Sequence, residues 1–162
     1  MSVIEAETVT ATQASVAAFP AMRRRGEMDR VGQQQPDLQG FLFDATGDLG
    51  APAQELAGYV FFVIHEAFRG RGGRLPLVES AAILRTLDEN QRLLERLGAE
   101  VFAKAEAPGE VTAQPALFSY MVEMVFGQNA AEPEIDGDEQ GTLFLILKTV
   151  IDALDDATGG SR

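Results

Sequence analysis

The sequence predicts an all-α protein of about five helices packed as a bundle. Through most of the chain, large apolar residues recur every three or four positions, which is the period of a helix with one buried face. Prolines stand at the starts of several of these apolar stretches and glycines at their ends, as is typical of helix boundaries. The apolar run 143–147 is short enough for a buried strand, but its continuation to Leu154 at helical spacing favours a helix.

Length and composition fit a single globular domain, because the 162 residues are 46% hydrophobic and 23% charged. Residues 1–35 contain few large apolar side chains. We therefore expect a poorly ordered or peripheral N-terminal arm, with a weak helix over 8–18 that ends before Pro20. The single helical domain is expected over 36–157, and residues 158–162 are expected to form a loose tail.

Two helices are predicted in the first half of this domain. The first begins at Pro36, which suits the first position of a helix, and it precedes a loop over 44–50. The second begins at Pro52 and ends at Gly70. Apolar residues cover almost every face of this second helix, and a helix of that kind belongs in the centre of a bundle.

The longest helix is predicted to run from Pro76 to Glu106. Six positions in it alternate in spacing between four and three residues, which is the pattern of a coiled-coil seam: Ile83, Leu87, Asn90, Leu94, Leu97 and Val101. Asn90 is the polar member, and a lone asparagine at such a position fixes the register and oligomeric state of paired helices. This predicts pairing with another helix, within the chain or across a dimer. The alternative is that the helix turns Asn90 to its rim.

Two further helices are predicted in the second half. One begins at Pro115 and ends at Gly127. After an acidic loop over 128–141, the other runs from Leu143 to Leu154. The polar stripe of this last helix consists of Lys148, Asp152 and Asp155.

The segments Gln35-Pro36-Asp37-Leu38 and Gln114-Pro115-Ala116-Leu117 are similar and lie 79 residues apart. Each opens a short helix that is followed by a loop and a strongly apolar helix. Two pseudo-equivalent helical hairpins around the long helix would explain the repetition. Coincidence is the alternative, because proline at a helix start is common.

The chain is strongly acidic, since 25 Asp and Glu against 13 Lys and Arg give a formal net charge of −12. Such a surface repels phosphate backbones and anionic lipids, so we expect neither nucleic acid nor a membrane as a partner. The longest apolar runs fall far short of the ~20 residues of a membrane-spanning helix. The N-terminus is acidic, unlike a signal peptide, and no cysteine is present for a disulfide, a thiolate nucleophile or a metal–thiolate site. These features favour a cytoplasmic protein.

His65 is the only histidine, and its surroundings fit neither of two common metal motifs. A zinc-protease motif needs a second histidine where Arg69 stands, and a carboxylate-bridged di-iron motif needs a glutamate where Phe62 stands. Glu66 is adjacent, but neighbouring helical residues point about 100° apart, so we do not expect the two side chains to pair. A structural histidine is favoured over a general base.

Arginines and glycines alternate over 69–74, which is the densest basic stretch of the chain. The guanidiniums of Arg69, Arg71 and Arg74, with His65 nearby, form a candidate binding site for a phosphate or carboxylate. The segment lacks the Gly-x-x-x-x-Gly-Lys pattern of a phosphate loop. The alternative is a helix stop and a solvated turn, with arginines favoured by the helix dipole.

The acidic loop offers carboxylates for a hard cation such as Ca²⁺, namely Glu132, Glu134, Asp136, Asp138 and Glu139. An EF-hand register that starts at Asp136 fails, because it puts Leu147 where the bidentate glutamate must stand. No Gly-x-Ser-x-Gly nucleophile motif occurs either. The sequence therefore predicts no metal site, no cofactor and no catalytic residue.

These observations favour a non-enzymatic helical interaction or scaffold protein of the cytoplasm. Its partner is another protein or a second copy of itself, as in a homodimer. The alternative is a helical bundle that binds or processes a small anionic ligand through Arg69, Arg71, Arg74 and His65. The sequence identifies neither the partner nor the ligand.

Overall fold

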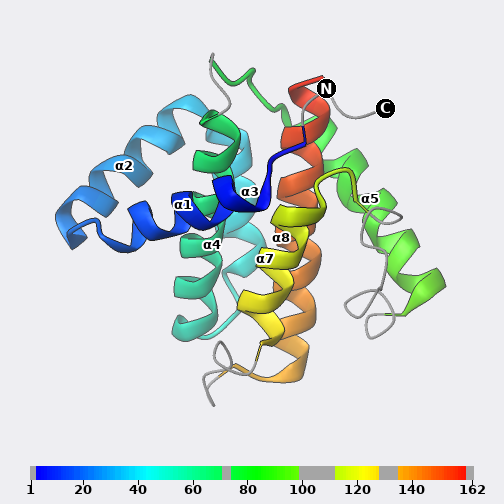
Figure 1. Cartoon of the computed structure of the whole chain (residues 1–162). Helices are drawn as coiled ribbons and strands as arrows, with labels where there is room; N and C mark the ends of the chain where they lie inside the picture. The colour runs from blue at the N-terminus through cyan, green and yellow to red at the C-terminus, as the bar shows by residue number, and fades with distance from the viewer. Residues whose placement is uncertain (1–2, 71–73, 99–111, 128–134, 160–162) are drawn as a thin grey trace.

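The computed structural model describes residues 3–70, 74–98, 112–127 and 135–159, and within these ranges it contains seven α-helices and no strand (Figure 1). The prediction of an all-helical fold is confirmed, with more helices than expected. The helices are α1 (Ala6–Ala17), α2 (Ala21–Gln34), α3 (Pro36–Thr46), α4 (Ala51–Arg69), α5 (Ser80–Leu97), α7 (Pro115–Phe126) and α8 (Gly137–Ala157).

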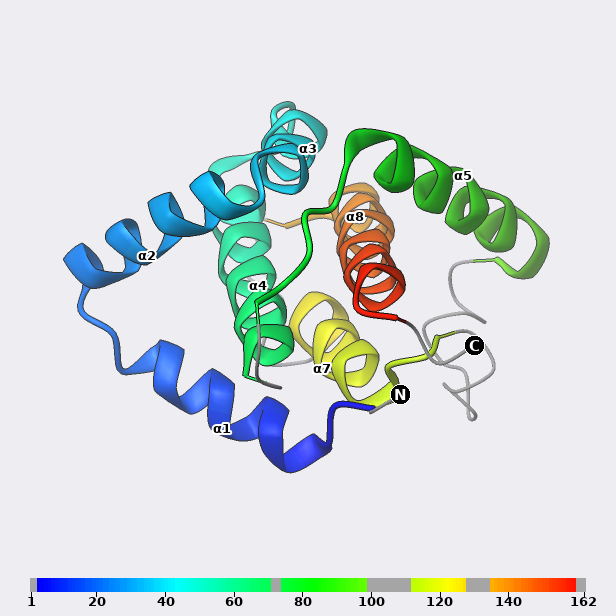
Figure 2. The same ribbon diagram turned by 90° about the horizontal axis from the view of Figure 1, so that it is seen from above.

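Helices α4 and α8 form the centre of the molecule (Figure 2). Residues 60–65 of α4 and residues 146–151 of α8 are buried without interruption. Six consecutive residues point in all directions around a helix, so each of these helices needs neighbours on every side. Helices α1, α3 and α7 pack against α4, whereas α3, α5 and α7 pack against α8.

The prediction that hairpins surround a long helix starting at Pro76 is corrected in two respects. Helix α5 starts at Ser80, because hydrogen bonds to the side chain of Gln35 hold the preceding segment in an extended form. It also lies at the edge of the bundle, while α4 and α8 occupy the centre. Gly98 follows α5 with a φ of +81°, a conformation that residues with side chains rarely adopt. The remainder of the predicted helix, 99–106, lies outside the described ranges.

Within residues 1–35, where we expect a poorly ordered or peripheral arm, the structure places two helices on the outside of the bundle (Figure 2). Helix α1 corresponds to the weak helix predicted over 8–18. It packs against α4 and α7, and its buried residues are Val9 and Val16. Helix α2 packs against α3 and buries Val31 alone. Because α2 is rich in arginine and glutamine, no apolar pattern predicts it.

Two buried glutamines, Gln35 and Gln114, make equivalent contacts through Oε1, whereas Nε2 donates to the backbone carbonyl of Pro76 in the first case and to the carboxylate of Asp155 in the second. Each precedes a helix-opening proline, at the N-terminus of α3 and α7 respectively. Oε1 of Gln35 accepts a hydrogen bond from the backbone N–H of Val78, and Oε1 of Gln114 accepts one from that of Ile4, both at 2.9 Å. Val78 and Ile4 each lie two residues before a helix, α5 and α1 respectively. We call these two side chains the glutamine clamps.

The helix contacts also come in matching pairs. Helix α1 packs against α4 and α7, and α5 packs against α8 and α3. Likewise, α7 reaches α4 and α3 reaches α8. We call α1, α2, α3 and α4 the first half of the chain and α5, α7 and α8 the second half. Each glutamine clamp therefore connects a helix of one half to the start of a helix in the other half.

Replacing either glutamine clamp with alanine should destabilise the protein by about 1–3 kcal/mol, because a buried backbone N–H loses its acceptor. The effect should also be local: Gln114→Ala should speed amide hydrogen exchange in α1, and Gln35→Ala should speed it in α5. Urea unfolding and hydrogen exchange measure the two effects. Gln91→Ala, at an exposed position of α5, is the control and should change neither. Identical exchange patterns in the two clamp variants would contradict this assignment.

Candidate functional site

Three arginines from separate segments line one pocket near the end of α4. Arg30 belongs to α2, Arg69 is the last residue of α4, and Arg74 lies in the extended segment before α5. The pocket has a volume of about 350 Å³, and its lining is completed by Gln33, Gln34, Gln35 and Leu75. We call this site the arginine corner.

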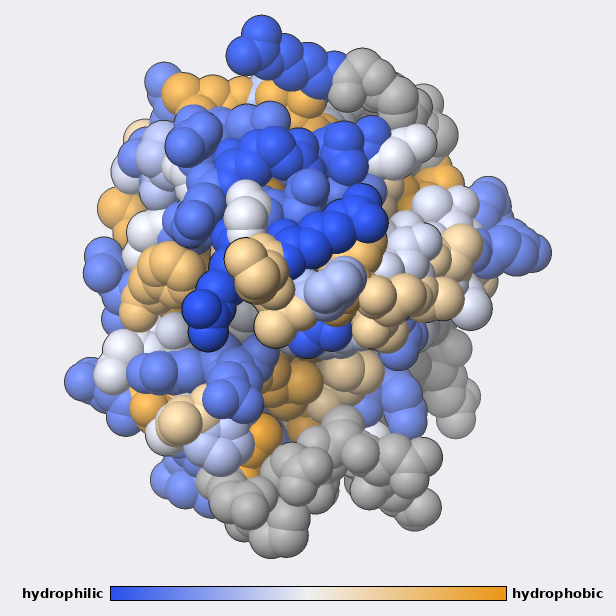
Figure 3. All heavy atoms as spheres, turned by 90° about the vertical axis from the view of Figure 1, so that its left-hand side faces the viewer, coloured by the Kyte–Doolittle hydropathy of each residue, from blue (hydrophilic) through white to orange (hydrophobic). Residues whose placement is uncertain are grey.

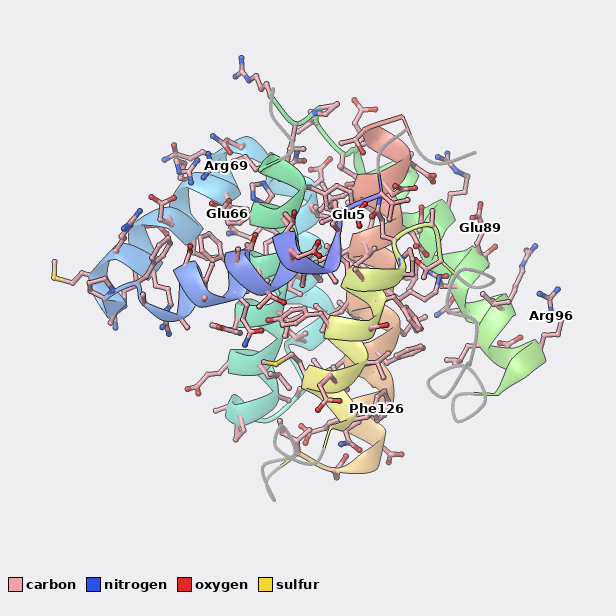
Figure 4. The ribbon with its side chains drawn as sticks, in the orientation of Figure 1. Glu5, Glu66, Arg69, Glu89, Arg96 and Phe126 are labelled. Carbon is pink, nitrogen blue, oxygen red and sulfur yellow. The ribbon has the colours of Figure 1, made fainter. Side chains whose placement is uncertain are left out.

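Glu66 holds two of these arginines in place, and Figure 4 labels it together with the first of them, Arg69. Its carboxylate accepts hydrogen bonds from Nε and Nη2 of Arg69, at 3.0 and 2.7 Å, and lies 3.8 Å from Nη2 of Arg30. Arg30 also pairs with Glu27, one turn earlier in α2. Neither glutamate lines the pocket, so among the residues that the structure describes its wall carries three positive charges and no negative one.

This arrangement keeps Glu66 ionised. Burial raises the pKa of its carboxyl group, but hydrogen bonds from His65 and Arg69, together with the charge of Arg69, outweigh burial and lower the pKa to about 2. The hydrogen bonds to Glu66 in turn raise the pKa of Arg69. At neutral pH the corner therefore presents guanidiniums that are held in place by ion pairs.

His65 lies inside the bundle rather than in the arginine corner. It is 1% exposed and does not line the pocket. Contrary to our expectation, its Nδ1 lies 3.1 Å from Oε2 of Glu66, because the glutamate side chain is long enough to turn back toward its neighbour. Nε2 of His65 is buried and finds no hydrogen-bond partner among the described residues. Of the four predicted ligand residues, the structure brings Arg69 and Arg74 together, and Arg71 lies outside the described ranges.

A larger pocket, of about 770 Å³, lies between α1 and the end of α4. Glu66 and Arg69 line it together with Arg23, whose guanidinium lies 3.9 Å from the centre of the Phe19 ring. Figure 3, which views the side on which α2 lies, shows strongly hydrophilic side chains gathered over the middle of this face. Because Glu7 also lines the pocket, its two arginines are matched by two carboxylates and it carries no excess charge.

A third pocket, of about 490 Å³, lies between α3 and α5 and is largely apolar. Its lining consists of Pro36, Asp37, Gly40, Phe41, Asp44, Ala45, Ser80, Ile83 and Leu84. Leu84 is 60% exposed, and Phe43, one turn beyond Gly40 on α3, is 52% exposed. We call this pocket the α3/α5 groove.

Asn90 pairs with α8 of the same chain. It is 5% exposed, its Oδ1 accepts a hydrogen bond from Nζ of Lys148 (2.8 Å), and its Nδ2 donates to Oδ2 of Asp152 (3.1 Å) and Oγ1 of Thr149 (3.2 Å). Lys148 also donates to Asp152 at 2.6 Å. Burial raises the pKa of Asp152, although Lys148 and Asn90 act in the opposite direction. Pairing within the chain is thus confirmed, and a rim position for Asn90 is wrong.

The acidic residues immediately before α8 and in its first turn cap helices. Oδ1 of Asp136 accepts a hydrogen bond from the backbone N–H of Glu139 (2.8 Å), and Oε1 of Glu139 accepts one from that of Asp136 (3.3 Å). Oε2 of Glu139 also accepts a hydrogen bond from the backbone N–H of Gly50, at the start of α4 (2.8 Å). Residues 128–134 lie outside the described ranges. In the rest of the described chain, no group of three His, Asp or Glu side chains is placed to hold a metal.

Comparisons with known proteins assign no function. No protein family, no curated protein and no solved structure matches the chain. Over the residues that the structure describes, no helix is both long enough and apolar enough to cross a membrane. The pockets, charges and exposed apolar residues are therefore the features that point to a function.

The Glu66–Arg69 pair predicts a loss of stability in acid. Because the pKa of Glu66 falls from 4.5 to about 2 on folding, its contribution is complete above pH 4.5 and is lost as the pH falls toward 2. We expect Glu66→Gln to be less stable than the wild type at pH 7, because the variant loses the ion pair with Arg69. The loss should be limited to about 1–2 kcal/mol, because solvent at the exposed Arg69 screens the pair. Urea unfolding between pH 7 and 2 should show this difference shrinking below pH 4.5. Glu55→Gln, exposed on the same helix, is the control, and a pH-independent difference for Glu66→Gln would refute the expectation.

Replacing Asn90 with leucine should cost about 1–3 kcal/mol, because Lys148 loses an acceptor and Asp152 a donor in a buried setting. The oligomeric mass should not change, since the partners of Asn90 belong to the same chain. Urea unfolding and light scattering measure the two quantities. Gln91→Leu, at the next and exposed position, controls for the added apolar side chain. A change of mass in Asn90→Leu alone would reassign Asn90 to a contact between subunits.

Proposed function

We propose that this chain is a non-enzymatic interaction protein, and that it binds an apolar segment with flanking basic residues from a protein partner in the α3/α5 groove. The observation that carries the proposal is the exposed Leu84 in the lining of the groove, together with further exposed apolar side chains on the elements that form it. Large hydrophobic residues are exposed at five described positions: Val3, Met22, Phe43, Leu77 and Leu84. Three of the five belong to α3, to α5 or to the segment that leads into α5. Exposed apolar surface beside a concavity is typical of a binding site.

The groove has a shape that a large apolar side chain can enter. Its volume is about 490 Å³, and Phe41 and Ile83 supply apolar walls from α3 and α5. Gly40 leaves part of the α3 side without a side chain, and a Cβ at this position would meet no atom within 4 Å. The space in front of Gly40 is therefore open to an incoming residue.

Charge favours a basic partner over a second copy of the chain. Asp37 and Asp44 line the groove, and the whole chain carries a net charge of −12. Lysine or arginine beside the apolar anchor would be attracted to this acidic lining. Two copies that met groove to groove would instead bring four carboxylates together.

We also propose that the two halves of the chain are related repeats, which the glutamine clamps and the matching helix contacts support. Gly40 of α3 and Ser119 of α7 are corresponding positions, because each lies the same number of residues after its glutamine clamp. Likewise, Thr10 of α1 and Leu84 of α5 are corresponding positions, because each lies the same number of residues after the first residue of its helix. The α1/α7 junction thus has two polar residues where the α3/α5 junction has a glycine and an exposed leucine. The glycine and the leucine that help to form the apolar groove are therefore not repeated at the α1/α7 junction, which supports a dedicated binding surface between α3 and α5.

A display library of short peptides, selected on the intact protein, tests the groove. We expect enrichment of peptides with a large apolar residue flanked by lysine or arginine. The affinity of a selected peptide should fall at least about tenfold in Leu84→Asp, which removes an apolar contact, and in Gly40→Leu, which fills the groove and favours the helix. Met22→Asp, at an 86% exposed apolar position of α2, is the matched control and should bind normally.

Three outcomes would overturn the proposal. These are enrichment of acidic peptides, equal loss of binding in Met22→Asp, and tight binding that survives both groove variants. Native mass spectrometry of the wild type adds a further check. A dimer that disappears in Leu84→Asp would replace the basic partner with a second copy of the chain.

A further inference from the structure

We propose that the arginine corner is a binding site for a small anion with a carboxylate or phosphate group. This site is separate from the α3/α5 groove and does not depend on the function proposed for it. Its residues differ from those that the sequence predicts, because Arg30 joins Arg69 and Arg74 and His65 does not take part. Gln33 and Gln34 add side-chain amides to the wall.

The charge of the corner contrasts with that of the chain. In a protein with a net charge of −12, the described lining of a pocket of about 350 Å³ contains three arginines and no acidic residue. Counting also the two glutamates that pair with these arginines, the local charge is still one positive unit. That unit belongs to Arg74, which is exposed and forms no ion pair with any described residue.

The ion pairs orient the guanidiniums without using all of their donors. Arg69 engages Glu66 through Nε and Nη2, and Arg30 engages Glu27 through the same two atoms. Within the described ranges, Nη1 of neither arginine donates a hydrogen bond to the protein. A guanidinium has five N–H donors, so each of these arginines keeps N–H groups for a ligand. Because the glutamates already hold the side chains, less rotamer entropy is lost on binding.

The size and donors of the corner select the class of ligand. Guanidinium groups recognise carboxylate and phosphate in a planar, two-point manner, and amide N–H groups donate further hydrogen bonds to their oxygens. The volume lies near the lower end of small-molecule sites, which suits a small metabolite rather than a dinucleotide or a polymer. Hence a compact monoanion or dianion is the ligand that fits.

Nuclear magnetic resonance of the arginine Nε–Hε groups in the intact protein tests the site, with inorganic phosphate as the probe at constant ionic strength. We expect saturable shifts of Arg30 and Arg69 in the wild type. Arg74→Gln should weaken phosphate about tenfold, because it removes the unpaired positive charge and leaves the Glu27 and Glu66 pairs intact. Gln34→Glu, which puts a carboxylate into the wall, should weaken phosphate at least as much.

Arg85→Gln is the matched control, because it removes the same charge from an exposed position of α5 outside the pocket. It should leave the phosphate affinity unchanged. Shifts that rise linearly without saturation would overturn the proposal. Equal weakening in Arg85→Gln and Arg74→Gln would overturn it as well, since phosphate would then be responding to net charge alone. Circular dichroism of each variant shows that the comparison is made on folded protein.

Discussion

The packing of α4 against α8 is the constraint on which the rest of the structure depends. Both helices contain a run of six buried residues, and such a run faces every direction around its axis. Neither helix can bury all of its apolar surface against a single neighbour. Helices α1, α3, α5 and α7 therefore surround the pair. The acidic residue Glu139 ties the start of α4 to the start of α8, and this keeps the two central helices in register at one end.

The sequence predicts α4 and the middle of α8 because their signal is local, but it misses the ends of α8, which begins at Gly137 within the predicted loop and continues to Ala157. The starts of α3 and α7 are marked by Pro36 and Pro115, and the apolar faces of α4 and α8 are continuous along the chain. Helix α2 is not predicted because it has no apolar stripe: it buries Val31 alone, and its other contacts include polar ones such as the approach of Arg30 to Glu66. The start of α5 is misplaced for a different reason. A proline signals a helix start, but the side chain of Gln35 competes for the backbone of the segment that follows.

The two candidate binding surfaces depend on distances that a sequence does not contain. The heptad pattern predicts that Ile83 is buried and leaves Leu84, which is 60% exposed, outside the seam, but it does not show that α3 lies beside both residues and forms a groove with them. Arg69 and Arg74 are close in sequence and could be grouped at once. Arg30 could not, because it reaches the same pocket from another helix. The His65–Glu66 contact shows the opposite error: backbone directions 100° apart do not prevent contact between a ring and a flexible carboxylate.

One residue supports both surfaces. Gln35 lines the arginine corner, and its side chain also forms hydrogen bonds with the backbone of Pro76 and Val78. These two residues belong to the segment that connects Arg74 to the first turn of α5. Ser80, at the start of that turn, lines the α3/α5 groove, and its N–H donates to Asp37 at 3.1 Å. Arg74 and Leu75 of the corner are therefore joined to Ser80 of the groove by one short segment, which a single buried amide holds. Arg74 and Leu84 lie beyond the hydrogen-bonded residues of this segment, so the two surfaces can be altered separately while their common support stays in place.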